Sequence, residues 1–138
     1  MQSALATLSS LPLFSALTGR QLRKILKSTS EDDYKAGEVI LRQGGQTRSL
    51  FIVLEGTVNI VRDGRRVARR GAGEFFGEIS MIDMRPRTAS AIAEGPVRCL
   101  VLPHKALRDL VMKDSGMAWS LLTTLASRLR DVDEPGSA

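Results

Sequence analysis

The spacing of hydrophobic residues changes twice along the chain. Near the N-terminus, Leu22, Ile25 and Leu26 recur at the three- and four-residue intervals of a helix. Thr18, followed three positions later by Gln21, has the form of a capping box and predicts the helix start. We therefore expect the first part of the chain to be helical.

The middle of the chain has the pattern of short β-strands. Apolar runs at residues 39–41, 50–54 and 57–61 are separated by recurrent glycines. Asp63 and Gly64 stand between two such runs and predict a two-residue hairpin. Many short strands with frequent turns favour a roll, sandwich or barrel, so we expect an antiparallel β-roll of the double-stranded β-helix or jelly-roll type.

Helical spacing returns towards the C-terminus. Pro103 is expected in the first turn of a helix, where its missing N–H costs nothing. Asp114 or Ser115 can cap a second helix. The buried stripe predicted for that helix is Met117, Leu121, Leu125 and Leu129, widened by Ala118, Leu122 and Val132.

These patterns predict an α+β fold, mainly β, that fills one domain of 138 residues. We assign residues 1–30 to an N-terminal helical segment, 31–102 to the β-roll and 103–133 to two C-terminal helices. No apolar run approaches the ~20 residues that span a bilayer, and the chain start lacks the positive region of a secretory signal. We therefore expect a cytoplasmic protein without a membrane partner.

The residues available for chemistry argue against catalysis and metal binding. Cys99 is the single cysteine and lies in an apolar run, which predicts a buried and inert thiol. His104 is the single histidine, so a His-rich metal centre or a Ser-His-Asp site is poorly supported. We expect a binding protein and not an enzyme.

Positive charge is concentrated in one part of the chain. The net charge is +5, which favours an anionic partner. Five arginines crowd the predicted hairpin: Arg62, Arg65, Arg66, Arg69 and Arg70. They form either a solvated hairpin or a basic patch that steers anionic ligands or meets an acidic partner. Aromatic residues make up 4% of the chain, too few for a surface that stacks single-stranded nucleic acid.

Residues 76–89 combine a glycine, a carboxylate and an arginine. Gly77 lets the backbone approach a ligand, and a short helix over residues 77–83 would point free N–H groups at an anion. Glu78 can accept hydrogen bonds from a hydroxyl, and Arg87 can hold a phosphate through two charge-assisted bonds. The alternative is a Glu78–Arg87 salt bridge in a surface loop. The combination suits a small ligand with a phosphate and a sugar diol.

The string Phe-Gly-Glu-Ile-Ser-Met-Ile-Asp-Met-Arg-Pro-Arg-Thr-Ala at residues 76–89 resembles the phosphate-binding cassette of cyclic nucleotide-binding domains. That family includes the catabolite activator protein, the regulatory subunits of cyclic AMP-dependent kinase and cyclic nucleotide-gated channels. Residues 12–14, 34–40 with 43–44, and 51–58 also resemble the family, as do the final helices, so the similarity covers roughly the whole chain. The cassette is assigned to residues 75–89.

The resemblance implies a role for each matching residue. Arg87 would hold the cyclic phosphate, with the hydroxyl and N–H of Thr88 beside it. Glu78 would bind the ribose 2′-hydroxyl, helped by backbone N–H groups near Gly77. Phe76, Ala89 and Val67 would line the sugar and base pocket, with plain core packing as the alternative for each. The expected ligand-binding set is Phe76, Gly77, Glu78, Ile79, Arg87, Thr88, Ala89 and Val67.

The last helix is expected to supply a contact to the base. Thr124, Arg128 and Val132 are the candidates for it. Trp119 could be a stacking lid, but its early place in the helix favours core packing. Because the helix reaches about residues 130–133 and the chain then ends, we expect no DNA-reading domain and no direct DNA binding.

The resemblance implies a regulatory sensor that binds cAMP or cGMP, without a metal, and repositions its last helix. Two other interpretations stay open. The chain could be the ligand-binding fragment of a transcription regulator or channel whose effector lies elsewhere. It could also be an interaction or dimerisation module that no longer binds a ligand. The expected oligomeric state is a monomer or a homodimer.

Overall fold

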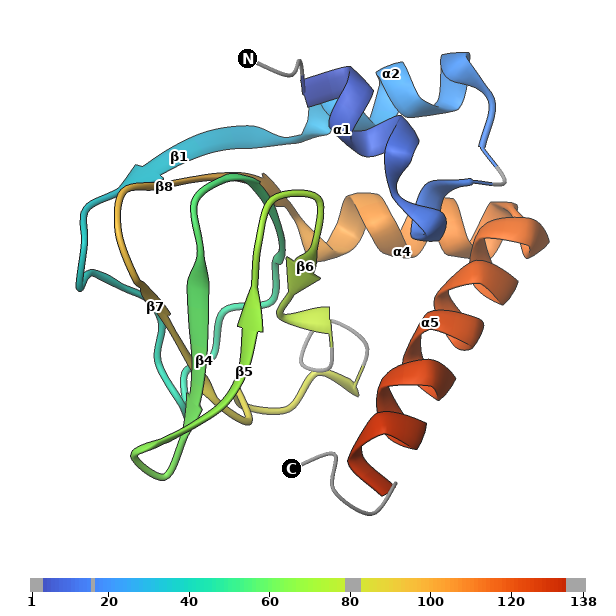
Figure 1. Ribbon diagram of the computed structural model, residues 1–138. Helices are drawn as coiled ribbons and strands as arrows, with labels where there is room; N and C mark the ends of the chain where they lie inside the picture. The colour runs from blue at the N-terminus through green and yellow to red at the C-terminus, as the bar shows by residue number, and fades with distance from the viewer. Residues whose placement is uncertain (1–3, 16, 79–82, 134–138) are drawn as a thin grey trace.

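The computed structural model describes residues 4–15, 17–78 and 83–133 of the chain. In this part of the chain, eight strands form a β-roll and the helices gather beside it (Figure 1). The helices are α1 (Ala4–Ser10), η1 (Pro12–Phe14, a 3-10 turn), α2 (Gly19–Ser28), α4 (His104–Lys113) and α5 (Ser115–Asp133). The strands are β1 (Ser30–Tyr34), β2 (Val39–Leu41), β3 (Leu50–Glu55), β4 (Val58–Arg62), β5 (Arg65–Arg70), β6 (Phe75–Phe76), β7 (Ser90–Ala93) and β8 (Val97–Leu102).

The strands form two antiparallel four-stranded sheets. One has the order β1-β8-β3-β6 and the other has the order β2-β7-β4-β5. Strands distant in sequence pair with each other, as β3 does with β8 and β4 does with β7. Such pairing between distant strands is the topology of a β-roll. The predicted antiparallel β-roll with flanking helices is therefore confirmed.

The sheet that contains β3 is covered on both faces. Leu50 and Ile52 pack among the helices, whereas Phe51 and Val53 point into the roll. All four side chains are buried. Because both faces need apolar side chains, β3 reads in the sequence as a continuous hydrophobic run and not as an alternating one.

The predicted hairpin at Asp63 and Gly64 is confirmed. Both residues have left-handed backbone angles, with φ of 52° and 79°, as the two-residue turn between twisted strands requires. Gln43 braces this turn: its side-chain amide donates to Asp63 Oδ1 over 2.8 Å and its Oε1 accepts from the Asp63 N–H over 2.9 Å.

Two of the predicted helix starts are observed in the structure, and the third differs by one position. Thr18 and Gln21 form both halves of the capping box, over 3.2 and 2.9 Å. Asp114 caps α5 by accepting the Met117 N–H over 2.9 Å. Pro103 was expected inside the first turn of its helix, but it is the residue before the turn. Its ψ of 144° is extended, so the helix begins at His104.

The apolar stripe of α5 is buried only at its start. Met117 and Leu121 lie in the core and Leu125 packs partly against it. Leu122 and Leu129 are exposed, and Trp119 is 68% exposed, so the expected core packing of Trp119 is wrong. The reason is the path of the helix: α5 packs on η1 and α4 and then runs down beside the roll (Figure 1). The Val132 side chain lies outside the described part.

Cys99 is a fully buried free thiol on β8, as predicted. Burial, with a smaller contribution from Asp32, raises the pKa of this thiol to about 12. Since the thiolate is the reactive form, Cys99 is inert in the folded protein at neutral pH.

Candidate functional site

The candidate site begins where β6 ends. Phe76 pairs with Phe51 of β3, and their rings stack with centroids 5.1 Å apart. Gly77 follows with φ of +89°, which favours glycine strongly. A Cβ at this position would lie 2.8 Å from Arg87 Nη1 and 3.0 Å from the Ser49 carbonyl oxygen. Position 77 therefore needs glycine for two reasons: the left-handed backbone of the turn, and the space that the Arg87 guanidinium occupies.

Arg87 is buried, with 4% of its surface exposed, and its guanidinium is held at three points. Nη1 donates to the Gly77 carbonyl over 2.6 Å and Nη2 donates to the Ser49 carbonyl over 2.8 Å. Nε donates to Thr47 Oγ1 over 3.3 Å. Burial lowers the pKa of Arg87, and the charge of Glu78 partly offsets this effect. The side chain is a fixed positive charge beside Gly77.

The backbone of Arg87 is also fixed from outside its own segment. Its N–H donates to the Gly45 carbonyl and its carbonyl accepts from the Gly44 N–H, each over 2.8 Å. The turn at residues 43–45 therefore sets the position from which the guanidinium reaches Gly77.

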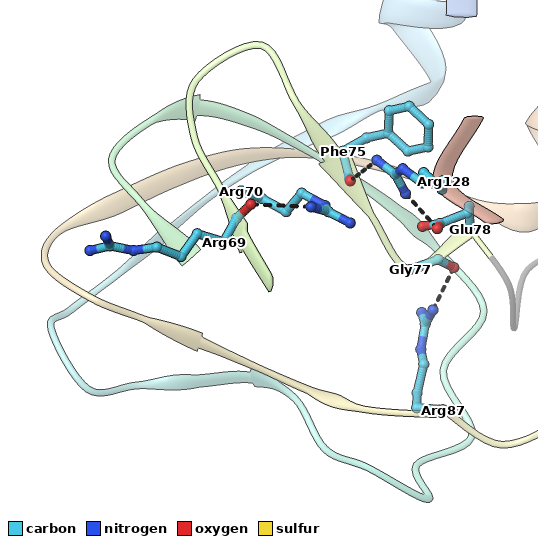
Figure 2. A network of polar contacts seen from close by, with 7 residues as sticks. All are labelled: Arg69, Arg70, Phe75, Gly77, Glu78, Arg87 and Arg128. Atoms are coloured by element: carbon cyan, nitrogen blue, oxygen red, sulfur yellow. Dashed lines mark hydrogen bonds and ion pairs between the residues drawn. The ribbon is translucent and has the colours of Figure 1, made fainter. Parts of the chain in front are cut away.

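Glu78 is buried too, but Arg87 is not its ion-pair partner. Its Oε1 accepts from Arg128 Nη1 of α5 over 2.5 Å. Arg128 Nη2 donates to the Phe75 carbonyl over 2.8 Å, and its guanidinium carbon lies 4.1 Å from the centroid of the Phe75 ring (Figure 2). The Glu78–Arg87 bridge in a surface loop, considered from the sequence, is wrong: both side chains are buried and Glu78 pairs with the helix.

Arg128 is the helix candidate that reaches the cassette. The Thr124 hydroxyl instead donates to the Ser120 carbonyl within α5, over 2.9 Å. α5 is therefore bonded through one side chain to the carboxylate and to the strand that precedes it.

A third arginine enters the site from β5. The sequence grouped Arg70 with the hairpin arginines, but it pairs with Val58, whose side chain is in the roll core. Figure 2 shows the Arg70 guanidinium on the side of Phe75 and Arg128, while the Arg69 side chain points away. Arg69 forms an ion pair with Glu94 at the surface. From the sequence alone, Arg70 cannot be told apart from the surface arginines beside it.

The other residues predicted for the site lie around Arg87 and Glu78 and differ in their exposure. Phe76 is buried in the roll, Ala89 is half-buried and Thr88 is exposed. The Thr88 carbonyl accepts from Arg62 Nε over 3.3 Å. Val67 lies at an irregularity in the β4–β5 ladder and is 48% exposed, so core packing does not explain it. Ile79, and most of the short helix expected over residues 77–83, lie outside the described residues.

The described residues, 4–15, 17–78 and 83–133, contain neither a cluster of metal ligands nor a helix fit to span a membrane. No group of three or more His, Cys, Asp or Glu side chains there could hold a metal ion. None of the helices there combines the length and the apolar character that crossing a membrane would need.

Comparison with known proteins assigns this arrangement to a family. Residues 31–114 match the family model described as the cyclic nucleotide-binding domain. The chain belongs to this family. The match contains the strands and segments that carry Gly77, Glu78 and Arg87, and the resemblance inferred from the cassette is confirmed.

Similar cyclic nucleotide-binding domains occur in longer proteins. The chain is 32% identical over 127 residues to the cyclic AMP receptor protein of Thermus thermophilus, covering 88% of this chain and 59% of that protein. Its fold resembles the crystal structure of the Thermus thermophilus catabolite activator protein with a TM-score of 0.79 and 33% identity, over 88% of this chain and 60% of that one. It also resembles the regulatory domain of Toxoplasma gondii PKA crystallised with cAMP, with a TM-score of 0.78 and 26% identity, over 90% of this chain and 48% of that one.

The chain spans between 19% and 59% of the length of three curated relatives that it matches. In the matching regulators the cyclic nucleotide-binding domain is regulatory and not catalytic.

Proposed function

We propose that this domain senses a cyclic purine nucleotide through the segment from Phe76 to Ala89. Arg87 binds the cyclic phosphate, with the Thr88 hydroxyl beside it, and Glu78 accepts a hydrogen bond from the ribose 2′-hydroxyl. The supporting observation is the pair of buried, opposite charges next to Gly77: a guanidinium and a carboxylate that are not bonded to each other. Each can therefore meet a different group of one small ligand.

The two charges suit different parts of the nucleotide. A guanidinium presents five donors and no acceptor, which matches a phosphate. A carboxylate has about four acceptor positions, so Glu78 can hold both Arg128 and a hydroxyl. Because these groups are buried, each contact to a ligand is made where water competes little.

Titration calorimetry with cAMP, cGMP and 5′-AMP tests this function. We expect binding of at least one cyclic nucleotide and much weaker binding of 5′-AMP, whose open phosphate carries more charge and lacks the ring geometry. cAMP and 5′-AMP share the adenine base and the ribose 2′-hydroxyl, so the comparison of these two ligands isolates the cyclic phosphate. Absence of heat with both cyclic nucleotides would leave the domain as an interaction module.

We also propose that ligand binding moves α5. Arg128 joins α5 to Glu78, so a ligand that engages Glu78 changes the energy of the helix position. A ligand can shift the helix only by the difference in its affinity for the two positions. An apolar groove of about 460 Å³ between α4, α5 and Met84 of the cassette gives side chains room to repack; it is lined by Met84, His104, Leu107, Arg108, Val111, Met112 and Leu121. The regulated output would be carried by another domain or protein, since the relatives are longer.

Trp119 reports this motion directly. It is the single tryptophan of the chain and lies exposed on α5. We expect a saturating cyclic nucleotide to change its fluorescence emission, and we expect Arg128→Ala to bind nucleotide but lose most of that change. Arg130→Ala removes the same charge from an exposed position of the same helix and is the matched control. An undiminished response in Arg128→Ala would refute the coupling.

A further inference from the structure

Arg70 occupies an unfavourable position for a charged side chain. Its guanidinium extends from the inward-facing side of β5, and Nη1 donates to the carbonyl of the neighbouring Arg69 over 3.1 Å. Its Nε is buried and has no acceptor among the described residues. A buried donor without a partner costs free energy, so an acceptor supplied by a ligand would be favourable here.

The electrostatic surroundings add to this cost. Burial lowers the pKa of Arg70, and the like charge of Arg128 lowers it further, while Glu78 and Glu74 act in the opposite direction. Glu78 already pairs with Arg128, and Glu74 Oε1 accepts the Gly71 N–H over 2.7 Å. None of the ion pairs among the described residues includes Arg70 or Arg87, whereas the charge of Arg128 is paired with Glu78.

Arg70 and Arg87 approach Glu78 from different directions (Figure 2). Each of them interacts electrostatically with Glu78. If the phosphate lies at Arg87 and the ribose hydroxyl at Glu78, the remaining part of a cyclic nucleotide is the base. The base would then extend towards the side from which Arg70 enters.

We propose that Arg70 binds the base edge of the nucleotide and makes the site prefer guanine to adenine. This inference rests on the proposed function. A guanidinium can only donate hydrogen bonds, and guanine offers two neighbouring acceptors, O6 and N7. Adenine offers the acceptor N7 beside an amino group that is a donor. A guanidinium is also a donor, so it cannot bond to this amino group. Arg70 is therefore a specificity-determining residue.

Cyclic IMP provides a sharp probe, because hypoxanthine has O6 and N7 but lacks the 2-amino group of guanine. In calorimetric titrations we expect cGMP and cyclic IMP to bind more tightly than cAMP by about five-fold to a hundred-fold, the usual discrimination of a bidentate arginine contact. Arg70→Leu should weaken cGMP and cyclic IMP selectively and bring all three nucleotides to similar affinities.

Arg69→Leu is the matched control, since it removes the same charge from the adjacent, outward-facing position. It should keep the preference for guanine. A wild-type preference for cAMP, or equal losses of all three nucleotides in Arg70→Leu, would overturn the base-reading role while leaving the proposed function intact. If the wild-type domain binds none of the cyclic nucleotides, the proposed function and this inference both fail. Thermal melting of both variants checks that each is folded.

Discussion

Replacing Arg87 with alanine is expected to weaken cyclic nucleotide binding by roughly thirty-fold or more. Removing one partner of a buried charge pair costs about 2–5 kcal/mol, and a factor of ten corresponds to about 1.4 kcal/mol. The phosphate would lose its bidentate donor, and the guanidinium that fills the space next to Gly77 would be absent. Calorimetry on the variant measures the loss.

The same substitution should destabilise the fold. The carbonyls of Gly77 and Ser49 both accept from Arg87, and each buried group that loses its partner costs about 1–3 kcal/mol. Urea denaturation without ligand therefore separates the structural role of Arg87 from its binding role. The stability loss should appear in the free energy of unfolding even where no nucleotide is present.

Two variants serve as controls for Arg87→Ala. Arg85→Ala removes an exposed charge two residues away and should change neither affinity nor stability. Arg87→Lys keeps the charge but cannot reproduce the planar pair of donors, so it should recover only part of both losses. Full affinity in Arg87→Ala would mean that the phosphate binds elsewhere.

Gly77→Ala is expected to lower both stability and nucleotide affinity. A left-handed backbone costs a residue with a Cβ roughly 1–2 kcal/mol. The new Cβ would also lie 2.8 Å from Arg87 Nη1 and 3.0 Å from the Ser49 carbonyl, so the arginine must move. We therefore expect a larger loss in the free energy of unfolding than the backbone strain alone would cause. We also expect a lower affinity for the nucleotide, because Arg87 is displaced from the phosphate.

Gly73→Ala separates these two effects. Gly73 has φ of +85°, but no atom lies within 4 Å of the Cβ position. It should show the backbone cost of about 1–2 kcal/mol without a change in affinity. Equal stability losses in the two variants, with unchanged nucleotide binding in both, would contradict the steric role assigned to Gly77. Denaturant unfolding and calorimetry on both variants decide the matter.

The fold was largely predictable because its signals are local. A capping box at Thr18 and a hairpin at Asp63 each depend on residues a few positions apart. The exposure of Trp119 was not predictable in this way. The apolar stripe of α5 continues beyond the point where the core ends, and the path of a helix is set by packing with distant elements.

The inward direction of Arg70 depends on one irregularity in a strand. Near the turn, Arg62 pairs with Arg65 and Val61 with Arg66, but beyond a register shift Val58 pairs with Arg70. Without the extra residue, Arg69 would lie opposite Val58 and would face the roll. A bulge of this kind moves every later side chain to the other face, and the sequence gives no local sign of it. Arg128 was foreseen only as one of three candidates, because its contact joins residues far apart in the chain.

The anchoring of α5 at its N-terminal end makes the helix a lever. Asp114 caps this end and also accepts from Gln21 of α2 over 3.1 Å, while Met117 is fully buried. Arg128 acts roughly 20 Å further along, at 1.5 Å per residue. At that distance from the fixed end, a small force on Arg128 is enough to rotate α5. A displacement of about 1 Å at Arg128 would rotate the helix axis by only about three degrees. If α5 moves as proposed, the contact between Arg128 and Glu78 would therefore set the angle of the helix in small steps.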